Sequence, residues 1–226
     1  LMTTKRGVKK AVYHAKVTQK SSLRKALLRR ELLHLTSSPA YLLNCALGTP
    51  ILIIAGAVLL IKGQDLVALA DMLPFPDNFL TVMMAVGVCV IGAMNDLTAP
   101  SISLEGKSLW IAQSLPVRPQ EVLHAKLRLH MLLTVIPELF CSACVCILLR
   151  PDLVTGVLCV ILPPVFTLSV AAFGLVVNLK KPNLSWQTEA VAVKQSIGIL
   201  IAMLGGWAIA AVLGAAYYLL YAKLSS

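Results

Sequence analysis

Five long apolar segments, separated by short polar stretches, make up most of this chain. A helix needs about 20 apolar residues to cross the hydrocarbon core of a bilayer. The second segment is the shortest and reaches that length only by including Asn95 and Asp96. We therefore predict an all-α membrane protein, a polytopic helical bundle. The five predicted spans cover approximately residues 40–61, 78–94, 127–149, 153–179 and 196–221.

The composition excludes a soluble domain of this size. Hydrophobic residues make up 58% and charged residues 13% of the 226 residues, so a soluble fold would expose too much apolar surface. No long polar stretch remains from which a second domain could be built. We predict a basic segment, residues 1–39, followed by one transmembrane domain, residues 40–226. Because five is an odd number of spans, we also expect a sixth span that this sequence lacks.

The basic residues predict the orientation of the bundle. Residues 1–39 carry ten Lys and Arg residues, the 95–128 loop carries four and the 178–196 loop three, against three on the opposite side. Basic residues concentrate on the cytoplasmic side of membrane proteins. The N-terminus and both long loops are therefore predicted to be cytoplasmic. The net charge of +10 then indicates topology, and we expect no nucleic-acid partner.

A basic, leucine-rich stretch precedes the first span. Its leucines, within residues 23–35, can gather on one side of a helix, with basic residues on the other. Ser22 is a candidate N-cap and Pro39 closes the segment. A basic amphipathic helix beside a span is expected to lie in the membrane interface. A solvated linker helix is the alternative.

Two apparent motifs are rejected because the residues around them do not fit the motif. Gly106-Lys107-Ser108 looks like the end of a phosphate-binding loop, but Ser101 stands where such a loop has its first glycine. A membrane span also replaces the buried strand that must precede it. Three cysteines of the third span would lie on different helix faces, with no ligand histidine nearby. We predict neither a nucleotide site nor a metal site in the chain.

Glu138 is the only acidic residue deep within an apolar segment. A carboxylate at the bilayer centre costs a few kcal/mol unless it is paired, protonated or hydrated. Proton coupling and the lining of a polar substrate path are therefore candidate roles. A hydrogen-bonded glutamate that fixes helix packing beside Pro137 is an equally good explanation, and the sequence leaves both open.

The first long loop carries apolar residues that would be unfavourable in water. We predict a short helix over residues 104–115, ended by Pro116, with the next helix starting at Pro119. Trp110 and Ile111 are expected to contact lipid headgroups or a partner protein. The second long loop also carries one tryptophan, Trp186, among mixed charges.

These loops resemble those of a known family. Residues 103–110, S-L-E-G-K-S-L-W, followed by Ser114-Leu115-Pro116, are similar to the S-x-E-G-x-x-x-W … S-L-P stretch after the second span in permeases of bacterial ABC-2-type exporters. Residues 186–196 resemble the same family's loop before the fifth span. The basic helix before Pro39 resembles its interfacial elbow helix. The resemblance covers roughly residues 21–221.

The resemblance implies one of two six-span transmembrane halves of an exporter in the bacterial plasma membrane. A separate ATP-binding subunit would hold ATP and Mg²⁺, so this chain would bind no cofactor and be no enzyme. Its first long loop would be a coupling helix seated in that subunit, supported by the second loop. The residues implied in coupling are Glu105, Gly106, Lys107, Trp110, Leu115, Pro116, Trp186, Glu189 and Lys194. The alternative function is a secondary transporter that uses Glu138.

Overall fold

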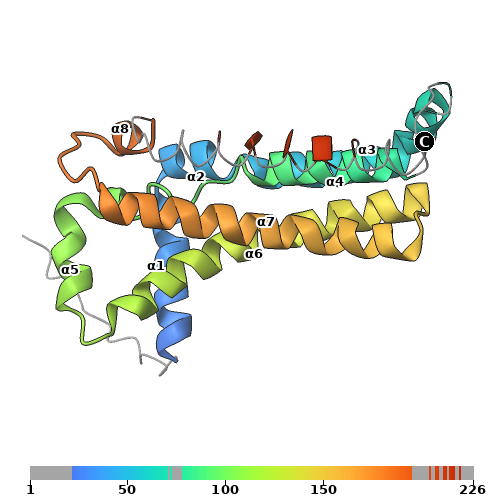
Figure 1. The fold of residues 1–226 in the computed structure, drawn as a ribbon. Coiled ribbons are helices and arrows are strands. Elements are labelled where there is room, and N and C mark those ends of the chain that lie inside the picture. The colour runs from blue at the N-terminus through green and yellow to red at the C-terminus, as the bar shows by residue number, and fades with distance from the viewer. Residues whose placement is uncertain are drawn as a thin grey trace, which may run out of the picture.

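The computed structural model describes residues 22–70, 72 and 78–194, together with residues 204, 207, 208, 211, 212, 214–216 and 219. Within these residues every regular element is a helix (Figure 1). The elements are α1 (Leu23–Ser37), α2 (Pro39–Cys45), α3 (Gly48–Ala70), α4 (Phe79–Gly92), the 3-10 helix η1 (Ser103–Ser108), α5 (Leu109–Ser114), α6 (Pro119–Leu149), α7 (Leu153–Lys180) and α8 (Glu189–Lys194). Most of the predicted fifth span, residues 196–221, lies outside the described residues.

Four helices, α3, α4, α6 and α7, pack side by side and form the body of the molecule (Figure 1). Among the described residues, α3, α6 and α7 are long and apolar enough to cross a membrane, whereas the apolar α4 has only 14 residues. The predicted third and fourth spans correspond to α6 and α7. Pro119 is the first residue of α6, as predicted. The prediction of five membrane spans stays a prediction.

The first predicted span is two helices instead of one. Helix α2 ends at Cys45, whose carbonyl oxygen accepts a hydrogen bond from the Asp96 amide at 3.0 Å. Helix α3 then begins at Gly48, and the Thr49 amide donates to Asn95 Oδ1 at 3.0 Å. Groups that follow α4 thus satisfy two of the backbone groups at the break. Pro50, which has no amide hydrogen, lies in the first turn of α3, where none is needed.

Helix α1 crosses α6 near one end of the body (Figure 1). Leu27 and Leu35 are buried, at 6% and 1% exposure. Ser22 occupies the N-cap position, but its side chain makes no capping hydrogen bond. Because Pro39 starts α2 with Ser38 as its N-cap, α1 ends at Ser37. The predicted helix is therefore present, and its place in a membrane interface stays a prediction.

Helices α6 and α7 form a hairpin with a tight turn. Arg150 takes a left-handed conformation, with φ 46°, immediately after α6. Asp152 caps α7, its carboxylate accepting from the amides of Val154 at 3.1 Å and Thr155 at 3.2 Å. Hydrogen bonds from Thr155 and Val154 hold the pKa of Asp152 below its usual value. The turn places the other ends of both helices beside η1, α5 and α8 (Figure 1).

Candidate functional site

The two loops that the sequence singled out meet at one end of the body. Helices η1 and α5 follow α4, and residues 181–188 link α7 to α8. Trp186 of the second loop donates from Nε1 to the Ser103 carbonyl oxygen at 2.6 Å. We call η1, α5 and residues 181–188 the loop platform. Trp186, which was predicted to support the first loop, therefore contacts that loop directly.

Gly106 permits this contact. Its backbone, at φ 47° and ψ −126°, forms a non-helical kink inside η1, so the predicted 104–115 helix is replaced by a kinked η1 followed by α5. Residues other than glycine rarely take this conformation. A Cβ atom at position 106 would also lie 2.8 Å from Trp186 Cζ2, which is too close for any real contact. The indole therefore packs directly on the Gly106 backbone.

Asn178, near the end of α7, holds the start of η1. Its Oδ1 accepts hydrogen bonds from the amides of Ile102 at 2.8 Å and Ser103 at 3.1 Å. Its Nδ2 donates to Ser103 Oγ at 2.7 Å, and the Asn183 amide donates to the same hydroxyl at 3.0 Å. Sequence reasoning missed Asn178. Its position as the only asparagine in an apolar helix was the available signal.

A buried ion cluster joins the loop platform to α1 and α6. Lys126 Nζ lies 2.7 Å from Glu105 Oε1 and 2.9 Å from Glu31 Oε2. Arg30 reaches Glu105 Oε2 at 3.1 Å, so Glu105 bridges two cations. The Lys126 and Glu105 side chains are each 3% exposed. Burial alone would raise the pKa of Glu105, but Lys126 and Arg30 more than compensate and lower it.

The predicted coupling residues therefore divide into buried and exposed sets. Glu105 is buried in the ion cluster and offers no surface to a partner. Trp110 is 64% and Ile111 45% exposed on α5, which stands away from the body (Figure 1). Leu115 is half-buried and Pro116 is exposed. The side chains of Lys107 and Lys194 lie outside what the structure describes.

The second loop continues into α8, which packs on α2. Ser38 Oγ donates a short hydrogen bond to Glu189 Oε2 and accepts one from the Tyr41 amide at 3.3 Å. Tyr41 in turn donates from its hydroxyl to the Leu97 carbonyl oxygen at 2.6 Å. Glu189 thus fixes α8 to the α1–α2 junction. Helix α8 also packs against η1, with Ala192 and Val193 in the same buried apolar cluster as Leu104.

A cavity of about 290 Å³ lies between the loop platform and the adjacent ends of α6 and α7. Glu105 and Lys126 of the ion cluster contribute to its wall, and the rest is mainly apolar. The lining residues include Leu109, Gln113, Val117, Val122, Leu123 and Leu179. The cavity therefore brings solvent-accessible space to the edge of an otherwise buried charge cluster.

Glu138 lies in the middle of the body with none of its surface exposed. Thr167 of α7 donates a short hydrogen bond to Glu138 Oε1, while Oε2 has no hydrogen-bond partner among the described residues. A Cβ atom on Gly92 of α4 would collide with Oε1, so α4 packs closely against the carboxyl group. Among the described residues, Glu138 therefore faces the interface between α4, α6 and α7, and its role in a substrate path stays a prediction.

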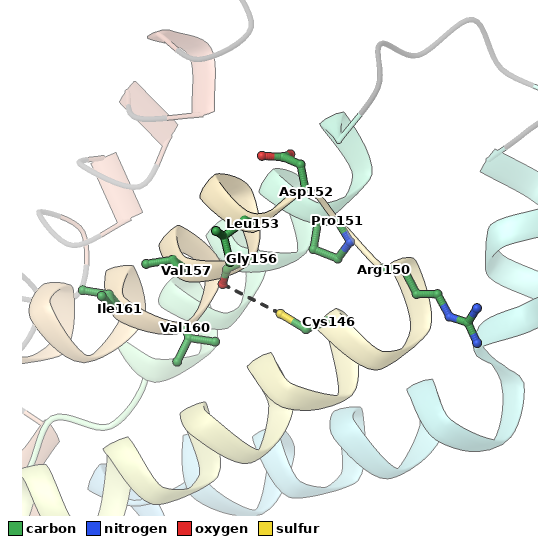
Figure 2. A pocket seen from close by; sticks show the side chains of 9 residues that line it. All are labelled: Cys146, Arg150, Pro151, Asp152, Leu153, Gly156, Val157, Val160 and Ile161. Carbon is green, nitrogen blue, oxygen red and sulfur yellow. Dashed lines mark hydrogen bonds between the residues drawn. The ribbon is translucent and has the colours of Figure 1, made fainter.

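The opposite end of the body carries a larger but shallower hollow of about 470 Å³, beside the α6–α7 turn (Figure 2). Its polar side chains do not converge on a common point. Asp152 caps α7, and Arg150 points away from the other labelled side chains (Figure 2). Cys146 Sγ lies 3.9 Å from the Gly156 carbonyl oxygen. These features stabilise the turn and define no ligand site.

No group of three metal-ligating side chains occurs among the described residues. All six cysteines are free thiols, five of them buried. Comparisons of the chain with family models, curated proteins and solved structures found no match.

Proposed function

We propose that this chain is the transmembrane permease subunit of an ATP-driven ABC exporter in a bacterial plasma membrane. In this proposal a partner subunit binds and hydrolyses ATP with Mg²⁺. The loop platform faces the cytoplasm and receives the motion of that subunit. A second transmembrane half, identical or related, completes the export path. The chain itself carries out no hydrolysis and binds no cofactor.

The observation that supports this proposal most is the build of the loop platform. Its root is held by hydrogen bonds from Asn178 and Trp186 and by the ion pairs of Glu105. Its tip presents Trp110 and Ile111 to solvent. A rigidly rooted element with an exposed aromatic tip is suited to docking in a groove of another protein, since buried aromatic anchors dominate many interfaces.

The same contacts give a route by which force on α5 reaches the helices of the body. A displacement of α5 moves η1, which contains Glu105. Glu105 is ion-paired to Lys126 on α6 and to Arg30 on α1. Asn178 links η1 to α7. Docking of a partner at Trp110 would therefore act on α1, α6 and α7 together.

The proposal is tested by purifying the full chain from its native membrane in mild detergent. We expect an ABC-type ATP-binding protein to co-purify, identified by mass spectrometry. Trp110→Asp places a charge at the exposed tip and should abolish that association. Met72→Asp, at an 80% exposed position between α3 and α4 and outside the predicted spans, serves as the matched control. Retention of the ATP-binding protein by Trp110→Asp would contradict the assigned docking surface.

A further inference from the structure

Polar side chains occur at every fourth residue along α6. The series is Lys126, His130, Thr134, Glu138 and Ser142, which we call the α6 column. None of the five is more than 4% exposed. Residues four apart lie on neighbouring positions of a helix face and rise by about 6 Å along its axis. The column therefore runs from the ion cluster to the middle of the body.

The column turns slowly around α6, and its partners change accordingly. At the platform end Lys126 contacts α1 and η1 through Glu31 and Glu105. Four residues on from His130, Thr134 Oγ1 accepts from Asn95 Nδ2 at 3.1 Å. Four residues further, Glu138 meets Thr167 of α7. Each step lies inside the bundle, between packed helices.

Among the described residues, several polar atoms along this line have no hydrogen-bond partner. They are His130 Nδ1 and Glu138 Oε2, together with Asp96 Oδ2 beside Asn95. Each is fully buried, and a buried polar atom without a hydrogen bond is costly. Buried water molecules commonly satisfy such groups, making about three hydrogen bonds each.

Few other charges surround Glu138 in the described part of the chain. From α4 it faces Gly92 and lies within electrostatic reach of Cys89, and from α7 it meets Thr167. The charged residues of α3, Lys62 and Asp65, are exposed, with side chains 73% and 78% accessible. Arg30 and Glu31 of α1 and Glu105 of η1 are paired within the ion cluster. Asp96, next to Asn95, is the one further carboxyl group near the column.

We propose that Glu138 is a proton-binding site that exchanges with the platform end of the bundle through water held along the α6 column. The cavity of about 290 Å³ reaches Lys126, the first residue of the column, and provides the entrance. A hydronium ion there passes its excess proton along the water chain, past His130 and Thr134, and remains as water. The Glu138 carboxylate takes the proton on Oε2, since Oε1 accepts from Thr167. The reverse transfer returns it.

This site is independent of the proposed export function, because proton exchange requires no partner subunit. The test therefore uses the full chain alone, in liposomes of phosphatidylcholine and phosphatidylglycerol. Infrared difference spectra between acidic and alkaline buffer detect the C=O stretch of a protonated carboxylic acid. We expect a buried-carboxyl band that is absent in Glu138→Gln and retained in Asp96→Asn. Exchange into deuterated buffer should shift the band.

The column is tested by the rate of that deuterium shift. His130→Leu and Thr134→Val remove polar groups between Lys126 and Glu138 at nearly constant shape, and each should slow the shift by about tenfold, the effect of losing one good hydrogen bond. Ser169→Ala removes an exposed hydroxyl of α7 that lies off the column and should leave the rate unchanged. If Glu138→Gln does not fold, Glu138→Asp replaces it, with a displaced band expected.

Three results would overturn the proposal. One is a spectrum with no carboxyl band that depends on residue 138. Another is a Glu138 band that changes neither with buffer pH nor on exchange into deuterated buffer. Glu138 would then be a permanently protonated residue that does not exchange protons with solvent. The third is an unchanged exchange rate in both His130→Leu and Thr134→Val, which would exclude the α6 column as the route.

Discussion

Gly106 shows, at the scale of one residue, how local backbone geometry sets the shape of the loop platform. Its φ of 47° kinks the chain inside η1, ahead of α5, and its lack of a side chain admits the indole of Trp186. We predict that Gly106→Ala lowers the free energy of unfolding by about 1–3 kcal/mol, the usual cost of a strained backbone position. Thermal unfolding in detergent, followed by tryptophan fluorescence, measures the effect.

Gly87→Ala is the control for this substitution. Gly87 lies within α4, and a Cβ atom there meets no atom of the described residues within 4 Å. Alanine also favours a helix over glycine by about 1 kcal/mol, so this variant should be as stable as the wild type or slightly more so. Equal stability of Gly106→Ala and the wild type would show that the Gly106 conformation is not required.

Glu105 contributes to stability in a way that depends on pH. Its pKa is lowered in the folded chain by Lys126 and Arg30, against the opposing effect of burial. A carboxyl group with a lowered folded pKa stabilises the fold fully above its unfolded pKa of about 4.3. That contribution is lost as the pH falls through the folded value. The unfolding temperature should therefore fall in acid, and fall less steeply in Glu105→Gln.

Glu105→Gln should also be less stable at neutral pH. It leaves the buried Lys126 and the half-buried Arg30 with one carboxylate, Glu31, in place of two. Removing one partner of a buried ion pair costs about 3–5 kcal/mol. Asp65→Asn removes the exposed partner of Lys62 and should cost at most about 1 kcal/mol. A Glu105 effect as small as that of Asp65 would refute the role of the cluster.

At the scale of elements, η1 depends on α7 for its position. Asn178→Leu would leave the amides of Ile102 and Ser103 without acceptors, at a cost of about 1–3 kcal/mol for each buried group. We expect these amides to exchange hydrogen for deuterium faster in the variant, as measured by mass spectrometry. Asn44→Leu, on exposed α2 surface, removes only a local bond to Ala40 and should leave them protected.

The helices of the body were predictable because continuous apolar runs dominate their sequence. Residues 127–149 and 153–179 correspond closely to α6 and α7, and Pro119 marked the true start of α6. The break between α2 and α3 was not predictable. It depends on Asn95 and Asp96, whose contacts to this region arise only in the folded bundle.

The loops that form the candidate site were predicted from the sequence, but the buried ion cluster beneath them was not. The residues of both long loops were identified from sequence, and the structure brings Trp186 onto η1. Lys126 and Glu31 were missed because charged residues are rarely buried. The regular spacing of the α6 column is visible in the sequence. Its meaning depends on which neighbouring helices cover it.

At the scale of the whole molecule, we propose that an ATP-binding partner displaces α5 and that this displacement moves the helix bundle. Trp110 is the residue that separates this claim from a purely structural one, because its exposed side chain contributes little to the fold. We therefore expect a Trp110 variant to fold normally but not to couple the partner's motion to the helix bundle. The path from Trp110 to α6 runs through Glu105 and Lys126.

The most direct measurement reconstitutes the chain with its ATP-binding partner and compares ATP hydrolysis between the wild-type complex and the Trp110→Ala complex. We predict that Trp110→Ala keeps the thermal unfolding temperature of the chain and lowers stimulated hydrolysis by at least about tenfold, as expected for the loss of an interface anchor. Ile147→Ala, at an exposed position on α6, should leave hydrolysis unchanged. Full hydrolysis in a correctly folded Trp110→Ala complex would contradict the account.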